Sequence, residues 1–170
     1  MLYTPKALAG AGGEAGINAL MDFAIAEANF CYANNQVNAR WNIAYRGLIN
    51  YSESGDVCTD AGWLQSNVSS LRSTYRADLA MMIVEYDNGG WSGCAWTWGT
   101  AFVRSHISSG MYLTVHEVSH FLGAGHDRLT CQNQPGNCGA MYAYSYGHRF
   151  LADGVVHCTV MSYVPGIGIP

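Results

Sequence analysis

Apolar residues recur at helical spacing over two stretches of the chain. Between residues 14 and 32 they return every three or four positions, while Asn18, Asp22 and Asn29 fall on the opposite side. Residues 60–75 carry a similar apolar stripe. Both stretches are therefore predicted to form amphipathic helices that bury one face.

Three other stretches have the patterns of strands. Residues 37–49 alternate between apolar and polar, as in a strand with one buried face. Residues 79–85 are continuously apolar up to the last position, which favours a strand buried on both faces. Residues 94–103 are rich in aromatic and β-branched residues and are predicted to form one strand. The order of helices and strands predicts an α/β (α+β) fold.

Composition and charge narrow the class of protein. The chain has 170 residues, 49% hydrophobic and 12% charged, which is typical of one globular domain. Its formal net charge is −4 and it has no cluster of Lys and Arg, so nucleic acid is not expected as a partner. No apolar run approaches the length of a membrane span, so no membrane association is expected. No feature indicates an oligomer, and a monomer is expected.

Cysteines at six positions fit a disulfide framework and an oxidising compartment. The expected pairs are Cys131 with Cys138, Cys31 with Cys58, and Cys94 with Cys158. Other pairings stay open, and some of these residues could instead be buried thiols. The opening residues, MLYTPKALAGAGGEAG, lack the continuous apolar core of a signal peptide. A secreted protein would thus have lost its targeting segment and any pro-segment.

The most specific pattern is HEVSHFLGAGHD, which begins at His116. On a helix, His116 and His120 project from one face, so that their imidazoles can share a metal ion. Glu117 lies beside them, where it can reach a water on the metal. Gly123 is expected to end the helix in a left-handed conformation, which lets the chain turn and bring back His126 as a third ligand.

Three neutral imidazoles with an open fourth position are typical of a catalytic zinc site. Zinc lowers the pKa of its bound water, and a neighbouring carboxylate can then take the proton. The short motif HExxH arises by chance in many chains. The extended HExxHxxGxxH fixes five positions and is expected by accident in on the order of 10⁻⁵ of chains with this composition. One catalytic Zn²⁺ is therefore predicted.

The extended motif resembles the signature of the metzincin zinc peptidases. Metzincins have a methionine turn beneath the metal, and CTVMSY supplies a candidate at Met161. The resemblance covers most of the chain and implies a single metallopeptidase domain over residues 1–170. Residues 1–126 would form an upper subdomain with a twisted mixed sheet above the cleft. Residues 127–170 would form a smaller, irregular lower subdomain with the Met-turn.

Two positions refine the resemblance. Asp127 follows the third histidine as in reprolysin-like (adamalysin) members, in which this aspartate is structural. Tyr163, two residues after the methionine, resembles astacins and serralysins, in which this tyrosine binds zinc at rest and supports the transition state. Bacterial peptidyl-Asp metallopeptidases combine both features and have a segment similar to YGHRF, so the chain resembles them most closely. His148 departs from the usual aromatic residue there, and specificity for aspartate is not carried over.

The resemblance implies roles for individual residues. Glu117 is expected to be the general base and then the acid that protonates the leaving amine, and Tyr163 to bind the oxyanion or act as a fifth ligand. Met161 and Asp127 are expected to shape the site without entering the chemistry. An edge strand would hold the extended substrate by main-chain hydrogen bonds. Its residues would be Cys94, Ala95, Trp96 and Thr97. Ordinary core positions are the alternative for Tyr163 and for this strand.

Other candidate ligands lack a matching pattern. The remaining histidines have no ligand spacing to the first three and are expected in the core or on the surface: His106, His148 and His157. Calcium is possible in a loop with Glu53, Asp56 and Asp60, but the loop has no EF-hand pattern, and a solvated loop is expected.

Together these patterns predict a secreted, extracellular zinc endopeptidase. It would hydrolyse internal bonds of a protein or peptide substrate through a zinc-bound water that Glu117 activates. One alternative is a zinc-bound binding module that does not cleave, against which the intact Glu117 argues. The other is a zinc amidase that acts on cell-wall peptides.

Overall fold

The computed structural model describes residues 1–85, 92–96, 101–105, 112–134, 136 and 138–162, with the backbone alone for 101–105. Its larger sheet has the strand order β2-β1-β3-β5-β4. The strands are β1 (Leu2–Tyr3), β2 (Gly47–Leu48), β3 (Ala80–Val84), β4 (Gly93–Ala95) and β5 (Ala101–Ser105). Only β4 is antiparallel to its neighbour, so the sheet is mixed, as the predicted fold class requires.

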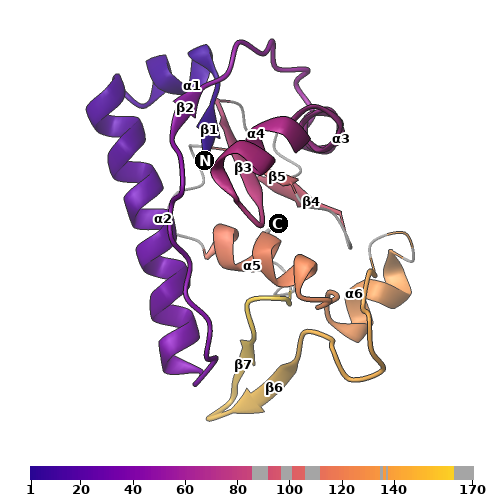
Figure 1. Ribbon diagram of the computed structural model, residues 1–170. Helices are drawn as coiled ribbons and strands as arrows, with labels where there is room; N and C mark the ends of the chain where they lie inside the picture. Colours follow the sequence, from indigo (N-terminus) through magenta and orange to yellow (C-terminus); the bar gives the residue numbers. More distant parts are fainter. Residues whose placement is uncertain (86–91, 97–100, 106–111, 135, 137, 163–170) are drawn as a thin grey trace.

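Helices flank this sheet, and a hairpin lies at the far end of the molecule (Figure 1). The helices are α1 (Pro5–Gly10), α2 (Glu14–Asn34), α3 (Val57–Asn67), α4 (Ser69–Tyr75), α5 (Leu113–Phe121) and α6 (Arg128–Asn133). The hairpin pairs β6 (Arg149–Ala152) with β7 (Val155–Cys158). In Figure 1 the sheet lies above α5, α6 lies to its right, and the hairpin lies below it. No helix in the described part of the chain is long and apolar enough to cross a membrane.

The central strand β3 is buried on both faces, which confirms the prediction from its continuous apolar run. Met81 and Ile83 face one hydrophobic cluster, which includes residues of α2 and α5. Ala80, Met82 and Val84 face the other cluster, which includes residues of α3. Side chains that alternate along β3 thus pack into both hydrophobic clusters, and the first cluster connects β3 with α5.

Both helix predictions identified the right stretches, but the second helix is divided in two. α2 begins at Glu14, as predicted. α3 begins earlier than predicted because the Asp56 side chain accepts a hydrogen bond from the Thr59 backbone N–H at 2.7 Å and caps the helix. The backbone then breaks at Val68, with φ −106° and ψ 4°, before α4 starts. Val68 is buried, so the break turns an apolar side chain into the core.

The predicted strand over residues 37–49 is wrong, except for β2. The Asn29 side chain on α2 accepts from the backbone N–H of Trp41 at 2.7 Å and donates to its carbonyl oxygen at 2.9 Å. Trp41 and Ile43 pack against the core next to α2. The alternation therefore arises from an extended segment that packs on a helix, which offers no ladder of backbone partners.

The single strand predicted over residues 94–103 is also wrong. It is two antiparallel strands, β4 and β5, and residues 97–100 between them lie outside the described residues. β1 and α1 were not predicted, although β1 pairs with both β2 and β3. A two-residue strand has no measurable period, so its position depends on the parallel strands around it.

The cysteine pairing was predicted correctly for one of the three pairs. Cys131 is bonded to Cys138, but Cys58 is bonded to Cys94, with 5.2 Å between their Cα atoms. The predicted pairs of Cys31 with Cys58 and of Cys94 with Cys158 are therefore wrong, and Cys31 and Cys158 are free thiols. The cause is the packing of α3 against β4, which brings Cys58 to the sheet edge.

Removing this disulfide with the double change Cys58→Ala and Cys94→Ala should destabilise the fold by about 2–4 kcal/mol. The bond spans 36 residues, so its loss frees a long loop in the unfolded chain. Denaturant unfolding measures the change. The pair Cys131 and Cys138, 7 residues apart, is the matched control and should give a smaller loss when replaced in the same way. An equal loss from both pairs would contradict this dependence on loop length.

The acidic loop before α3 is not the solvated loop that was expected. Asp60 is fully buried and accepts hydrogen bonds from the Tyr51 hydroxyl at 2.6 Å and the Ser54 backbone N–H at 3.0 Å. Glu53 accepts from the backbone N–H of Glu85 at 3.0 Å. These carboxylates therefore fasten the loop to α3 and to the end of β3.

Candidate metal centre

Helix α5 carries the first residues of the centre on its buried side. His116, Glu117 and His120 are all buried. Gly123 follows the helix with φ 87°, in the left-handed region that favours glycine. The turn brings His126 back to the first two histidines. One ring nitrogen from each of the three lies within 4.8 Å of the others.

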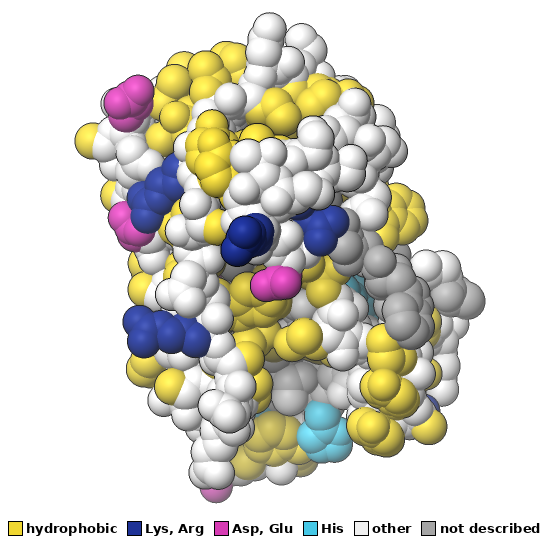
Figure 2. Space-filling view, viewed as in Figure 1, with side chains coloured by type: hydrophobic (Ala, Val, Ile, Leu, Met, Phe, Trp, Pro, Cys, Tyr) yellow, Lys and Arg dark blue, Asp and Glu magenta, His cyan; other side chains and the backbone are white. Residues whose placement is uncertain are grey.

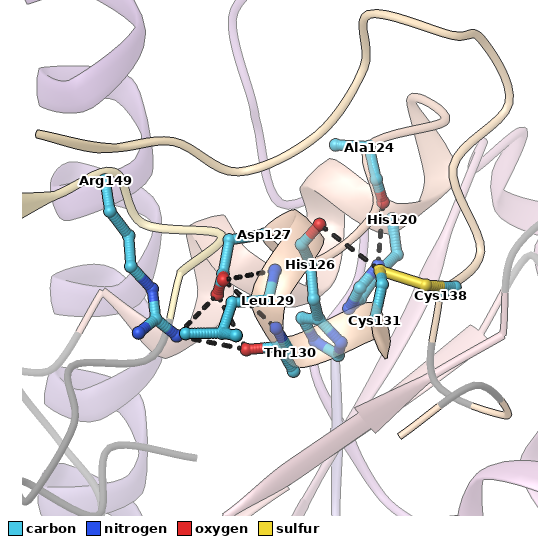
Figure 3. The surroundings of a disulfide bond; sticks show 9 residues. All are labelled: His120, Ala124, His126, Asp127, Leu129, Thr130, Cys131, Cys138 and Arg149. Carbon is cyan, nitrogen blue, oxygen red and sulfur yellow. Dashed lines mark hydrogen bonds and ion pairs between the residues drawn. A yellow bond between two sulfur atoms is a disulfide. The ribbon is translucent and has the colours of Figure 1, made fainter. Parts of the chain in front are cut away.

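Backbone carbonyls orient two of the imidazoles. Nδ1 of His116 donates to the carbonyl oxygen of Val160 at 2.7 Å, and Nδ1 of His120 donates to that of Ala124 at 2.9 Å (Figure 3 shows the second). A ring whose Nδ1 carries the proton has its lone pair on Nε2. Both Nε2 atoms are therefore available as metal ligands, and the carbonyls fix the direction of each ring.

This donor set fits a divalent metal ion. Nε2 of His116 and Nε2 of His126 are 3.1 Å apart. Tetrahedral zinc with ordinary Zn–N bonds would place two nitrogens about 3.3 Å apart. Burial, reinforced by His120, lowers the pKa of His116 to about 3, and burial, reinforced by His126, lowers that of His120 to about 4. Both rings are thus neutral near pH 7, which is the state that binds a metal.

Asp127 points away from the histidines, toward α6 (Figure 3). Its carboxylate caps α6 by accepting from the backbone N–H groups of Leu129 and Thr130, each at 3.1 Å. It also accepts from the Thr130 hydroxyl at 2.7 Å and pairs with Arg149 at 2.9 Å. The side chains of Asp127 and Arg149 are only 4% and 18% exposed. Sequence reasoning gave Arg149 no role, because nothing in YGHRF indicates its partner.

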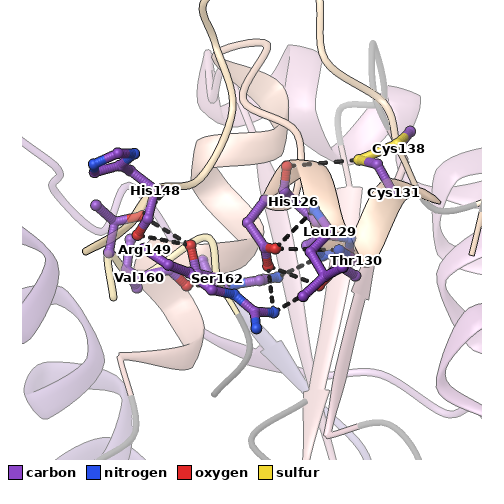
Figure 4. Close-up of polar contacts among 12 residues, drawn as sticks. His126, Leu129, Thr130, Cys131, Cys138, His148, Arg149, Val160 and Ser162 are labelled. Carbon is purple, nitrogen blue, oxygen red and sulfur yellow. Dashed lines mark hydrogen bonds and ion pairs between the residues drawn. A yellow bond between two sulfur atoms is a disulfide. The ribbon is translucent and has the colours of Figure 1, made fainter. Parts of the chain in front are cut away.

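The segment around Met161 is bonded to both parts of the HEVSHFLGAGHD motif. The carbonyl of Val160 holds His116, and the carbonyl of buried Met161 accepts from the backbone N–H of Asp127 at 3.1 Å. Ser162 fastens the segment by donating its hydroxyl to the carbonyl oxygen of His148 at 3.1 Å (Figure 4). Sequence reasoning missed Val160, since a backbone carbonyl leaves no signal in the sequence, and it missed Ser162, whose partner is the backbone of a residue 14 positions away.

Strand β4 forms one end of the sheet order, next to α5. A Cβ atom built on Gly93 would lie 2.5 Å from Oε1 of Glu117, so this strand approaches the carboxylate closely. Of the residues expected to hold a substrate, Cys94 and Ala95 are in β4, and Trp96 follows with 51% of its surface exposed. Thr97 and Tyr163 lie outside the described residues.

The other histidines do not join this centre in the described part of the chain. His148 and His157 flank Phe150 at the hairpin, with ring centroids 6.0 and 5.2 Å from its ring. His106 lies outside the described residues.

A mixed sheet over a helix with three convergent, buried imidazoles defines a class of α+β metalloproteins. Residues 18–127 match the family described as Metallo-peptidase family M12B Reprolysin-like. This match covers more than half of the chain, and the chain belongs to that family. The predicted likeness to metzincin-type peptidases is therefore confirmed.

Curated relatives of the chain are bacterial. The peptidyl-Asp metalloendopeptidase of Xanthomonas campestris is 30% identical over an alignment of 182 positions, which covers 100% of this chain and 41% of the relative. The protein of the same name from Stenotrophomonas maltophilia is 31% identical over an alignment of 176 positions, which covers 96% of this chain and 40% of the relative. The chain thus spans about two fifths of the length of these relatives.

The fold also occurs among solved structures. One that is described as a chaperone-substrate complex superposes with a TM-score of 0.66 at 19% sequence identity. The superposition covers 95% of this chain and 29% of that chain. At this identity the likeness shows a shared fold.

Proposed function

We propose that this chain is a zinc endopeptidase that hydrolyses internal peptide bonds. The observation that carries the proposal is the convergence of three histidine nitrogens within 4.8 Å beside the buried Glu117. The family of the chain and the names of its relatives support the same activity.

In this proposal His116, His120 and His126 hold one Zn²⁺. Bound there, zinc supplies a Lewis acid that makes a water more acidic and polarises the scissile carbonyl. Glu117 accepts a proton from the attacking water on its carboxylate and passes it to the nitrogen of the leaving amine as the C–N bond breaks. Tyr163 is proposed to donate a hydrogen bond to the developing oxyanion. Met161 and Asp127 position the ligands through backbone contacts.

We further propose that the substrate lies extended along Cys94, Ala95, Trp96 and Thr97. β4 has no strand on its outer side among the described residues, so its backbone groups there can pair with a peptide. Residues 1–170 would act as one monomeric catalytic domain, with residues 1–126 above the cleft and 127–170 below. The two disulfides are compatible with an extracellular location.

Zinc-dependent cleavage of an unfolded protein tests the proposed function. The protein is stripped of metal, reloaded with one equivalent of Zn²⁺ and incubated with the substrate, and mass spectrometry identifies the products. Internal fragments that need zinc are the expected result. Bound zinc without cleavage of any protein would favour the binding module, and release from cell-wall peptides alone would favour the amidase.

Replacing Gly93 by Ala should lower kcat about 10- to 100-fold without loss of zinc. The added methyl group would lie 2.5 Å from Oε1 of Glu117 and 2.9 Å from Cδ1 of Leu113, so the carboxylate must move. A displacement of about 1 Å at a catalytic group can cost roughly 10²-fold in rate. Steady-state kinetics and metal analysis measure the two quantities.

Gly62→Ala is the matched control for this substitution. Gly62 lies in α3, and a Cβ atom there would meet no atom within 4 Å. Alanine at this position should leave kcat unchanged and raise stability by about 0.5–1 kcal/mol. Full activity of Gly93→Ala would contradict the proposed position of Glu117.

A further inference from the structure

A cavity of about 540 Å³ lies on the side of α5 opposite the histidines. Thr114 and Val118 of α5 line it together with Leu122, which directly follows the helix, and the three are spaced four residues apart. His116 and His120 are offset from them by two residues, which places the imidazoles about half a turn away. The cavity therefore shares a helix with the metal centre but is separate from it.

The lining of this cavity is mainly apolar. It includes Ile25 of α2, Trp41 and Ile43 of the extended segment, Leu71 of α4, and the strand residue Met81. Its volume is within the roughly 300–1,000 Å³ of pockets that hold small molecules. A ligand for this space needs an apolar body.

Positive charge gathers at the same cavity, although the chain as a whole is acidic. Arg40, Arg72 and Arg76 line it, and Asp78 is the one acidic side chain in its lining among the described residues. Among the described residues, Arg40 and Arg76 form no ion pair. Figure 2 shows basic side chains around a yellow, hydrophobic area, with acidic side chains beside some of them.

One buried N–H donor at the cavity has no acceptor among the described residues, and it is Nε of Arg72. The Arg72 guanidinium does donate through one terminal nitrogen to the carbonyl oxygen of Asp78 at 2.6 Å. A buried donor without a partner is unfavourable. An anionic group in the cavity could accept from such a donor.

We propose that this cavity binds an amphipathic carboxylate, with an alkyl chain among the apolar residues and its carboxylate at the arginines. Arginine pairs well with carboxylates, since its planar N–H groups match their two oxygens. The apolar walls exclude a fully hydrated anion, and the arginines disfavour an alkyl cation. The ligand would thus contact the reverse side of the helix that carries His116 and His120.

Titration of the full chain with sodium decanoate tests this proposal, and nuclear magnetic resonance follows the indole N–H signals. The Trp41 signal is assigned by its loss in Trp41→Phe. A saturable shift of that signal is expected. Because the readout is binding at Trp41, it does not depend on proteolysis or on the proposed function.

Charge reversal at the exposed arginines distinguishes binding at a specific anion site from nonspecific binding to a hydrophobic surface. Arg40→Glu combined with Arg76→Glu should weaken decanoate binding at least tenfold. Lys6→Glu, on α1 and outside the cavity, is the matched control and should leave the affinity unchanged. The cation decyltrimethylammonium should bind at least tenfold more weakly than decanoate. No saturable shift, equal binding by the double variant, or equal binding of the cation would each overturn the proposal.

Discussion

The change Glu117→Gln should lower kcat/KM for peptide cleavage by about 10²- to 10⁴-fold while one zinc ion stays bound. Glutamine has nearly the same shape, but its amide cannot accept a proton from water, and general acid–base catalysis contributes an effect of this size. Glu117 is not a ligand in the proposed site, so the three imidazoles still hold the metal. Kinetics on a defined peptide and metal analysis of the same sample check both parts.

Glu14→Gln is the control for this change. Glu14 is exposed in the first turn of α2, and its replacement should leave both activity and zinc content unaltered. If Glu117→Gln keeps full activity with zinc bound, another group must act as the base. If it loses zinc, Glu117 takes part in binding the metal, and the proposed division of roles is wrong.

The change Asp127→Ala should destabilise the protein by about 3–5 kcal/mol. It leaves the largely buried Arg149 guanidinium without its carboxylate, and breaking a buried ion pair from one side has a cost of this order. It also removes the cap of α6. Denaturant unfolding of the zinc-free protein measures the effect on the fold without a contribution from metal binding.

Two comparisons show whether the buried charge is the cause. Adding Arg149→Met to Asp127→Ala should recover a large part of the lost stability, since no unpaired charge then stays in the interior. Asp22→Ala removes the carboxylate of the exposed pair with Arg46 and should change stability little. If Asp127→Ala unfolded at the same denaturant concentration as the unchanged protein, the role given to Asp127 would be refuted.

Helices and strands long enough to show a regular apolar pattern could be predicted from the sequence, and short ones could not. α2 and β3 each bury residues at the spacing that their sequence indicates. The segment over residues 37–46 has the alternation of a strand, but the Asn29 amide occupies the backbone of Trp41 that a neighbouring strand would need. The pattern of apolar and polar residues therefore indicates which side chains are buried. Tertiary packing decides which groups form hydrogen bonds with the backbone.

One part of the candidate site could likewise be predicted from the sequence, and another part could not. The spacing of His116, His120 and His126 predicts their convergence, because a helix and a glycine turn determine it locally. The groups that orient His116 and that pair with Asp127 were not predictable. Val160 acts through a carbonyl that every residue has, and Arg149 reaches Asp127 from 22 positions away. Such contacts depend on how the lower part of the chain folds back.

The bond from His116 to Val160 has a consequence for biosynthesis. The two residues are 44 positions apart, and the contact of Met161 with Asp127 lies equally late in the chain. During translation, the strands of the larger sheet and α5 are synthesised well before either carbonyl exists. A nascent chain can thus form its hydrophobic core while His116 still lacks the acceptor that directs its ring. The ordered metal centre is completed only after the Met161 segment has emerged, so this geometry itself delays the assembly of a competent centre during synthesis.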